Sequence, residues 1–173
     1  MDKRTRTSKT TEWRRYNAED KLWIPYFYIM YHYWWRFLKI AYEEKKVIRW
    51  KYYQGWGGKD MFNTTFKTWW KYHYKKLFAQ KEPVAADKIR FPMTTNGRAA
   101  QSLKTTLEIH KLKRYKDGWV IYDKLCKKRL DKFVTIDKDP DKHVEIAEVN
   151  RNIKRYRDKC KKILDNVCVG KFP

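Results

Sequence analysis

Apolar and aromatic side chains recur along much of the chain at the spacing of an α-helix, and this pattern predicts a mainly α fold. From Pro25 to about Glu44 the sequence PYFYIMYHYWWRFLKIAYEE contains no helix breaker beyond its first residue. A helix that is apolar around most of its circumference is a buried one. We therefore expect this helix at the centre of an aromatic core within residues 16–80. The residues expected innermost are Tyr26, Met30, Tyr33, Phe37 and Ile40.

A second amphipathic helix is predicted over FKTWWKYHYKKLF, residues 66–78, with Asn63 or Thr64 as its N-cap. Interleaved aromatics and lysines are typical of surfaces that stack nucleic-acid bases, but they also arise where one helix face is buried. The helical wheel favours burial. The face predicted to be buried holds Phe62, Phe66, Trp69, Trp70, His73 and Leu77. The opposite side presents a secondary basic face of Lys67, Lys71 and Lys75.

Glycines, prolines and short polar runs divide the remainder of the chain. The glycines of YYQGWGG indicate a loop before the second helix, and neither GxxxxGK[ST] nor GxGxxG is present there. Residues 81–96 are predicted to be a linker with a short extended segment near 88–93, KIRFPM. Residues 97–173 are expected to be helical and to form one domain with 16–80. Within them, 119–136 fit either a helix or a short strand at WVIY.

The last helix has the clearest pattern. Its apolar residues recur at alternating spacings of three and four, as in the a/d seam of a coiled coil. The seam consists of Ile146, Val149, Ile153, Tyr156, Cys160, Ile163 and Val167. It indicates either the side on which the helix packs against its own domain or a pairing surface in a homo-oligomer. Gly170 is placed to end the helix, and we favour one continuous helix over a helix–turn–helix-like pair broken at Asn150.

The charge composition adds an expectation about partners. The chain has 42 Lys and Arg residues against 20 Asp and Glu residues, a formal net charge of +22. Such an excess is repulsive in the folded state unless an anionic partner neutralises it. Nucleic acid is the first candidate partner, with DNA favoured, and an acidic protein surface and an anionic membrane are the others.

Two basic segments are candidates for phosphate contact. The last helix carries Arg151, Lys154, Arg155, Lys161 and Lys162 away from its seam, at a spacing that suits phosphates along a duplex groove. Residues 1–15 are interpreted as a flexible basic arm that enters a minor groove or grips an acidic surface. Its candidate contact residues are Lys3, Arg4, Arg6, Arg14 and Arg15.

Sequence motifs for catalysis or metal binding are absent. The four histidines lack HxxxH or HExxH spacing, and the three cysteines lack CxxC spacing. The acids from Asp137 to Glu148 approach a calcium loop but have Lys142 where glycine is needed. We expect no enzyme activity, no cofactor, no metal, and, from the odd number of cysteines, a reducing compartment.

The longest uncharged run, Leu22–Trp35, bears on localisation. It is shorter than the roughly 20 residues that span a bilayer, and a core helix explains it better than a segment lying in the membrane interface. We therefore expect a soluble protein, either in the cytoplasm of a bacterial host or associated with a virion.

Three segments resemble those of a known group. YWWRFLKIAYE, then FNTTFKTWWKYHYKKLF after a glycine-containing loop, resemble small tryptophan-rich proteins of phage-like and integrative mobile elements. The end, VNRNIKRYRDKCKKILDNVCVGKFP, is similar to their basic terminal helix closing in G-x-FP. The resemblance covers about half the chain and implies a mobile-element setting. It brings no catalytic residues and is compatible with DNA binding and with particle assembly.

Together these features predict a non-enzymatic nucleic-acid-binding accessory protein of a phage or mobile element, which binds mainly through phosphates. The alternative is a structural or assembly protein, a scaffold or capsid-associated factor that docks its basic surface, arm or GKFP tail on acidic subunits. Binding to a membrane surface is the third hypothesis.

Overall fold

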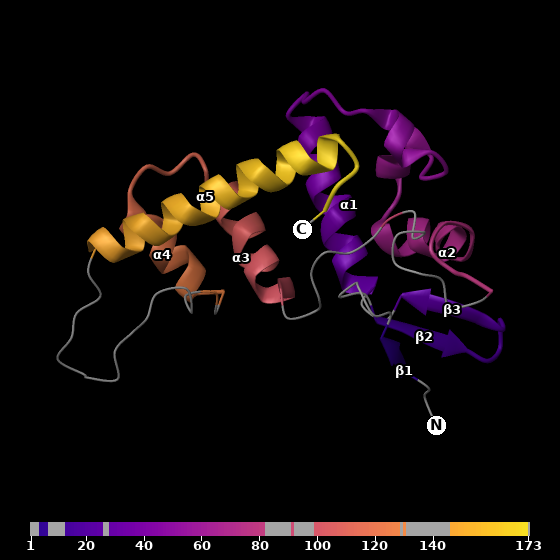
Figure 1. Ribbon diagram of the computed structural model, residues 1–173. Coiled ribbons are helices and arrows are strands. Elements are labelled where there is room, and N and C mark those ends of the chain that lie inside the picture. Colours follow the sequence, from indigo (N-terminus) through magenta and orange to yellow (C-terminus); the bar gives the residue numbers. More distant parts are fainter. Residues whose placement is uncertain are drawn as a thin grey trace. The chain divides into compact units, whose positions relative to one another are not determined.

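The computed structural model describes residues 4–6, 13–25, 28–81, 91, 99–128, 130 and 146–172 (Figure 1). The strands are β1 (Arg4–Arg6), β2 (Trp13–Asn17) and β3 (Leu22–Pro25). The helices are α1 (Tyr28–Glu43), the 3-10 turns η1 (Trp50–Tyr53) and η2 (Gly58–Asn63), α2 (Phe66–Leu77), α3 (Ala100–Lys111), α4 (Gly118–Cys126) and α5 (Ile146–Cys168). The predicted mainly α fold, with an aromatic core and a long C-terminal helix, is confirmed.

The chain divides into two compact units, and the expectation that 97–173 form one domain with 16–80 stays a prediction. The first unit combines Met1–Ala100 with Ile163–Pro173, and the second is Gln101–Lys162. Helix α5 therefore supplies residues to both units. One boundary falls inside this helix, where no change in composition marks it.

Helix α1 supplies the centre of the first unit. Of the residues predicted to lie innermost, Met30 and Phe37 are fully buried and Tyr33 is 7% exposed. Ile40 is only half-buried, and Tyr26 lies outside the described residues. The helix buries Trp34 as well. Large aromatic side chains remove much apolar area from water, so this helix is a main source of stability for the unit.

Buried aromatic side chains in this core have partners for several of their polar atoms, which burial requires. The Trp34 indole nitrogen donates to the Tyr53 hydroxyl at 2.9 Å, and that hydroxyl donates to the carbonyl oxygen of Val167. The Trp69 indole nitrogen donates to the carbonyl oxygen of Trp56 at 2.7 Å. These bonds join residues from four separate stretches of the chain, so the core is specified by polar contacts as well as by apolar burial.

Helix α2 buries the face that the wheel predicts. Phe66, Trp69 and Leu77 are buried, and Phe62, Trp70 and His73 are half-buried. The predicted N-cap is wrong by one residue: the hydroxyl of Thr65 accepts from the backbone N–H of Thr68 at 3.2 Å. The helix begins at Phe66, so Thr65 is the residue placed to satisfy a free N–H of its first turn.

The three strands form an antiparallel sheet in the order β1-β2-β3. Trp23 of β3 and Gln80, just after α2, exchange both backbone hydrogen bonds, at 2.7 and 2.9 Å. The sheet is thereby tied to the end of α2. The predicted flexible arm, residues 1–15, contains strand β1 and the beginning of strand β2. The predicted extended segment near 88–93 lies outside the described residues except for Phe91, which is buried.

The second unit has its own apolar core. Its buried cluster consists of Ile109, Ile121, Tyr122, Leu125, Leu130, Val149 and Ile153. The stretch WVIY belongs to α4 and not to a strand. Asp117 caps this helix, because its side chain accepts a hydrogen bond from the Trp119 N–H at 2.8 Å.

Helix α5 is continuous through Asn150, as favoured from its pattern. Most of its seam is buried within the chain: Val149, Ile153, Cys160, Ile163 and Val167 are each at most 3% exposed. Tyr156 is half-buried, and Ile146 is 39% exposed. The seam is therefore a packing surface in the monomer. Gly170 follows the helix with φ of +74°, as the predicted C-terminal stop requires.

Candidate nucleic-acid interface

The side of α5 opposite its seam presents the predicted phosphate-contacting residues. Arg151, Lys154, Arg155, Lys161 and Lys162 are all exposed. Val149 and Ile153 hold this part of the helix by packing into the core of the second unit. Since α-helical residues three or four apart lie on one face, burial of the seam forces these five side chains outward. We call them the α5 basic face.

The α5 basic face has no acidic partner in the part of the chain that the structure describes. Ion pairs there engage other lysines, such as Lys111 and Lys128, which both bind the buried side chain of Glu108. Burial disfavours ionisation of Glu108, but the hydrogen bonds from both lysines outweigh it and hold the pKa of this carboxyl below its ordinary value. The Arg155 guanidinium of the basic face lies over the ring of Tyr156, 5.6 Å from its centre.

Two further cations of α5 are turned away from this face. Arg157 donates to the carbonyl oxygen of Tyr115 at 2.9 Å, and Lys159 donates to the hydroxyl of Ser102 at 2.7 Å. Burial, and then the nearby charge of Arg155, lowers the pKa of Lys159. Both residues therefore help to attach α5 to the rest of the second unit, and we leave them out of the interface.

An acidic residue, Asp158, interrupts the basic face, and the sequence interpretation missed it. Asp158 is exposed and lies three or four residues from Lys154, Arg155, Lys161 and Lys162, hence on the same side of the helix. It divides the cations into an N-terminal group of three and a C-terminal pair. At 1.5 Å of rise per residue the centres of the two groups are about 12 Å apart along the axis. The sequence contained this signal, since the helical wheel alone places Asp158 there.

The second unit carries another cationic surface, which is not among the interface residues predicted from the sequence. The Arg114 guanidinium lies 5.0 Å from the centre of the Tyr115 ring, and the Lys124 ammonium lies 5.1 Å from it. The hydrogen bond from Arg114 is the main reason why the pKa of Tyr115 lies below its ordinary value. These residues add positive potential to the same unit as the α5 basic face.

The secondary basic face on α2 keeps two of its three predicted lysines. Lys67 and Lys71 are exposed and have no acidic partner among the described residues. Lys75 is different, because its ammonium pairs with Asp20 at 2.6 Å. Its charge is committed within the chain, so we remove it from the candidate residues.

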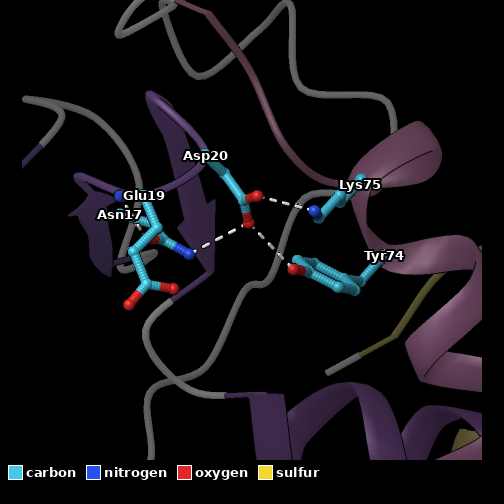
Figure 2. A network of polar contacts seen from close by, with 5 residues as sticks. All are labelled: Asn17, Glu19, Asp20, Tyr74 and Lys75. Atoms are coloured by element: carbon cyan, nitrogen blue, oxygen red, sulfur yellow. Dashed lines mark hydrogen bonds and ion pairs between the residues drawn. The ribbon is translucent and has the colours of Figure 1, made fainter.

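Asp20 is the centre of a polar network between the β2–β3 turn and α2 (Figure 2). Besides the ammonium of Lys75, its carboxylate accepts from the Asn17 amide at 3.0 Å and from the Tyr74 hydroxyl at 3.2 Å. The hydrogen bond from Lys75 is the largest cause that holds the pKa of Asp20 below its ordinary value. The same bond raises the pKa of Lys75.

We expect Asp20→Asn to lower stability at neutral pH and to have little effect in acid. Because the folded-state pKa of Asp20 is depressed, its ionised form contributes stability above the unfolded-state pKa of about 3.9, and this contribution is lost as pH falls through the folded-state value. The measurement is the urea midpoint of both proteins between pH 7 and about pH 3. Asp60→Asn is the control, because Asp60 is exposed and has no recorded ion pair. A difference that does not change with pH would contradict the network.

The predicted arm residues are placed only in part. Arg4 lies in β1 and Arg15 in β2, and the two are directly opposite each other in the register. Arg6 and Arg14 also lie in these strands, whereas Lys3 is outside the described residues. Strand pairing thus brings two of the arm's arginines to neighbouring positions.

The structure offers little for other chemistry where it is described. Within the described ranges no group of three or more His, Cys, Asp or Glu side chains is arranged to hold a metal ion. The three cysteines are free thiols. No described helix combines the length and the apolar character needed to cross a membrane. His73 donates from Nδ1 to the carbonyl oxygen of Trp69 at 2.8 Å, and His32 stacks on Phe66.

A scan against protein-family models gave no match, and comparisons with curated proteins and with solved structures gave none either.

Proposed function

We propose that this protein is a non-enzymatic nucleic-acid-binding accessory protein of a phage or mobile genetic element, with DNA as its favoured target. The observation that carries the proposal is the α5 basic face, five exposed cations with no acidic partner among the described residues. Cations that are not neutralised within the chain gain most from phosphates, because each contact releases condensed counterions from the nucleic acid. The mobile-element setting rests on the resemblance of the tryptophan-rich segments and the terminal helix.

The spacing within the α5 basic face also favours a duplex. Its two cationic groups are about 12 Å apart, similar to the roughly 12 Å width of the major groove of B-DNA. A helix lying across that groove would place one group near each phosphate backbone. Asp158, between the groups, would face the groove and not a phosphate. Such contacts position the protein without reading bases, so we expect little sequence preference.

The assembly alternative has less support. One of its arguments was the heptad seam, which is mostly buried in the monomer. Another was the GKFP tail, in which Phe172 is 2% exposed and stacks on Trp34 with ring centres 5.4 Å apart. A side chain already packed into the core of its own chain is not available to dock on another subunit.

The test is a salt titration of binding to duplex DNA, single-stranded DNA and RNA of equal length. Five phosphate contacts on duplex DNA predict that affinity falls about 500-fold between 50 and 200 mM salt. We expect binding to persist at physiological ionic strength, with a preference among the three probes. Weak binding that vanishes near 150 mM salt for all three probes would contradict the proposal. Light scattering in the same buffers measures the mass of the particle and would show whether the chain assembles into oligomers instead.

A further inference from the structure

A groove of about 490 Å³ lies in the first unit, at the C-terminal end of α1. Its volume is within the range of about 300–1,000 Å³ that is usual for sites of small ligands. It is lined by Tyr42, Trp50, Lys45, Lys46, Lys59 and Glu43, among others. Neither the predicted arm nor the α5 basic face contributes to it, so its chemistry is not explained by the phosphate contacts proposed above.

One wall of the groove is aromatic. Tyr42 is 40% exposed, and its ring stacks on Phe62 with centres 5.3 Å apart. Trp50 meets Tyr42 edge-on, at 6.3 Å and an interplanar angle of 71°. Phe62 and Tyr53 support the two rings from the core side. Rigid, partly exposed rings of this kind stack flat heterocycles such as nucleic-acid bases.

The polar lining is mainly cationic. Lys45 and Lys59 are exposed, and neither has an acidic partner among the described residues. Lys46 donates to the Asp165 carboxylate at 2.8 Å, and this hydrogen bond is the first cause of the raised pKa of Lys46. Glu43 is the acidic residue of the lining and lies 3.9 Å from the ammonium of Lys39. The two unpaired lysines therefore leave the groove positively charged.

Lys45 occupies a backbone position where glycine would be favoured. Its φ is +55°, and it follows α1 as the left-handed residue of a Schellman-type ending. The N–H of Lys46 bonds to the Ala41 oxygen at 2.9 Å, and the N–H of Lys45 bonds to the Tyr42 oxygen at 3.0 Å. A side chain with a β-carbon is strained in this conformation. A lysine at a position that glycine suits better supports a role for its ammonium in the groove.

We infer that this groove binds one unpaired nucleotide of a single-stranded nucleic acid, with the base stacked on Tyr42 and Trp50 and the phosphate held by Lys45 and Lys59. The inference rests on the proposed function and adds a preference for unpaired ends or single strands. Aromatic stacking with a cationic rim is the combination that single-strand-binding proteins use without reading sequence. A free mononucleotide shares this chemistry, and a single strand differs in presenting a phosphate on both sides of the base.

The test uses a single-stranded tetradeoxynucleotide carrying one 2-aminopurine, whose fluorescence is quenched when the base stacks on an aromatic ring. We expect the protein to quench it. Lys45→Gly combined with Lys59→Gln should weaken binding about 10-fold or more, as should Tyr42→Ala. Lys45→Gly alone should also raise the melting temperature, because glycine relieves the left-handed backbone. A variant that is more stable yet binds more weakly cannot be explained by unfolding.

The matched control is Lys76→Gln with Lys171→Gln, which removes two exposed charges of the same unit that do not line the groove and belong to neither basic face. Equal losses in the groove variant and in this control would overturn the inference, as would absence of quenching by the unaltered protein. Adenosine monophosphate that displaces the tetranucleotide at equal concentration would also overturn it, in favour of a free-nucleotide site. The proposed function fails separately, on the duplex titration, since the groove variants keep the α5 basic face.

Discussion

We expect glutamate at positions Arg151, Lys154, Arg155, Lys161 and Lys162 to abolish the proposed duplex binding at physiological salt without unfolding the protein. All five side chains are exposed, so their loss removes no core contact. Each phosphate contact contributes a slope of about −0.9 to the dependence of log affinity on log salt, so a matching alanine variant should lower the magnitude of the slope by about 4.5. Fluorescence anisotropy with a labelled duplex measures both affinity and slope, and circular dichroism checks the fold.

Asp158→Asn is expected to act in the opposite direction and to strengthen duplex binding a few-fold. The substitution removes the negative charge that lies between the two cationic groups and that lowers the positive potential both groups present to the duplex. Lys76→Glu with Lys104→Glu serves as a second comparison, because it alters exposed charges of α2 and α3 that belong to neither basic face. If all charge reversals weaken binding in proportion to net charge, the protein acts as a diffuse polycation and the α5 basic face is not its interface.

The parts of the fold that the sequence predicted well are those in which burial follows a helical period. Met30, Phe37, Trp69 and Ile153 recur at helical spacing within long runs without breakers, and each is buried. Such a period records which side of a helix faces a core, whatever that core contains. The same reasoning placed the α5 basic face outward, since its residues occupy the remaining side of the wheel.

The features that the sequence did not predict depend on contacts between distant residues. The pairing of Lys75 with Asp20 joins a helix to a turn far away in sequence, and no local pattern indicates it. Strand pairing of Arg4 with Arg15 is equally hidden, because neither RTR nor WRRYN shows the alternation of apolar and polar residues that usually marks a strand. The groove beside Tyr42 requires the 3-10 turns to fold back toward the end of α1, which periodicity cannot show.

The C-terminal tail illustrates this difference most clearly, since it resembles an exposed docking peptide in sequence but is part of the core. Gly170 turns the chain after α5. It packs so closely against Tyr52 that a β-carbon added to Gly170 would lie 2.5 Å from the β-carbon of Tyr52. The turn brings Phe172 onto Trp34, with near-parallel rings, and within 6.0 Å of the Phe37 ring centre. A short tail is thus fixed by aromatic contacts with the central helix of the first unit.

Phe172→Ala is accordingly expected to destabilise the protein by about 3–5 kcal/mol, the usual cost of removing a buried phenylalanine ring and leaving a cavity. That is a large part of the roughly 5–15 kcal/mol by which domains are stable. Chemical denaturation of the full chain, followed by tryptophan fluorescence, measures the change. Lys171→Ala is the control, because Lys171 is exposed in the same tail. It should change stability by no more than about 0.5 kcal/mol.

The result also decides between the two functions considered for this chain. If Phe172→Ala leaves stability unchanged, the tail is not packed in solution and is available to a partner, which favours assembly. If stability falls as expected, the tail is an internal element, and its removal weakens assembly or nucleic-acid binding only through unfolding. Repeating the duplex titration well below the melting temperature of the variant separates these effects: a folded Phe172→Ala protein should bind DNA with unchanged affinity, because the α5 basic face lies elsewhere in the chain.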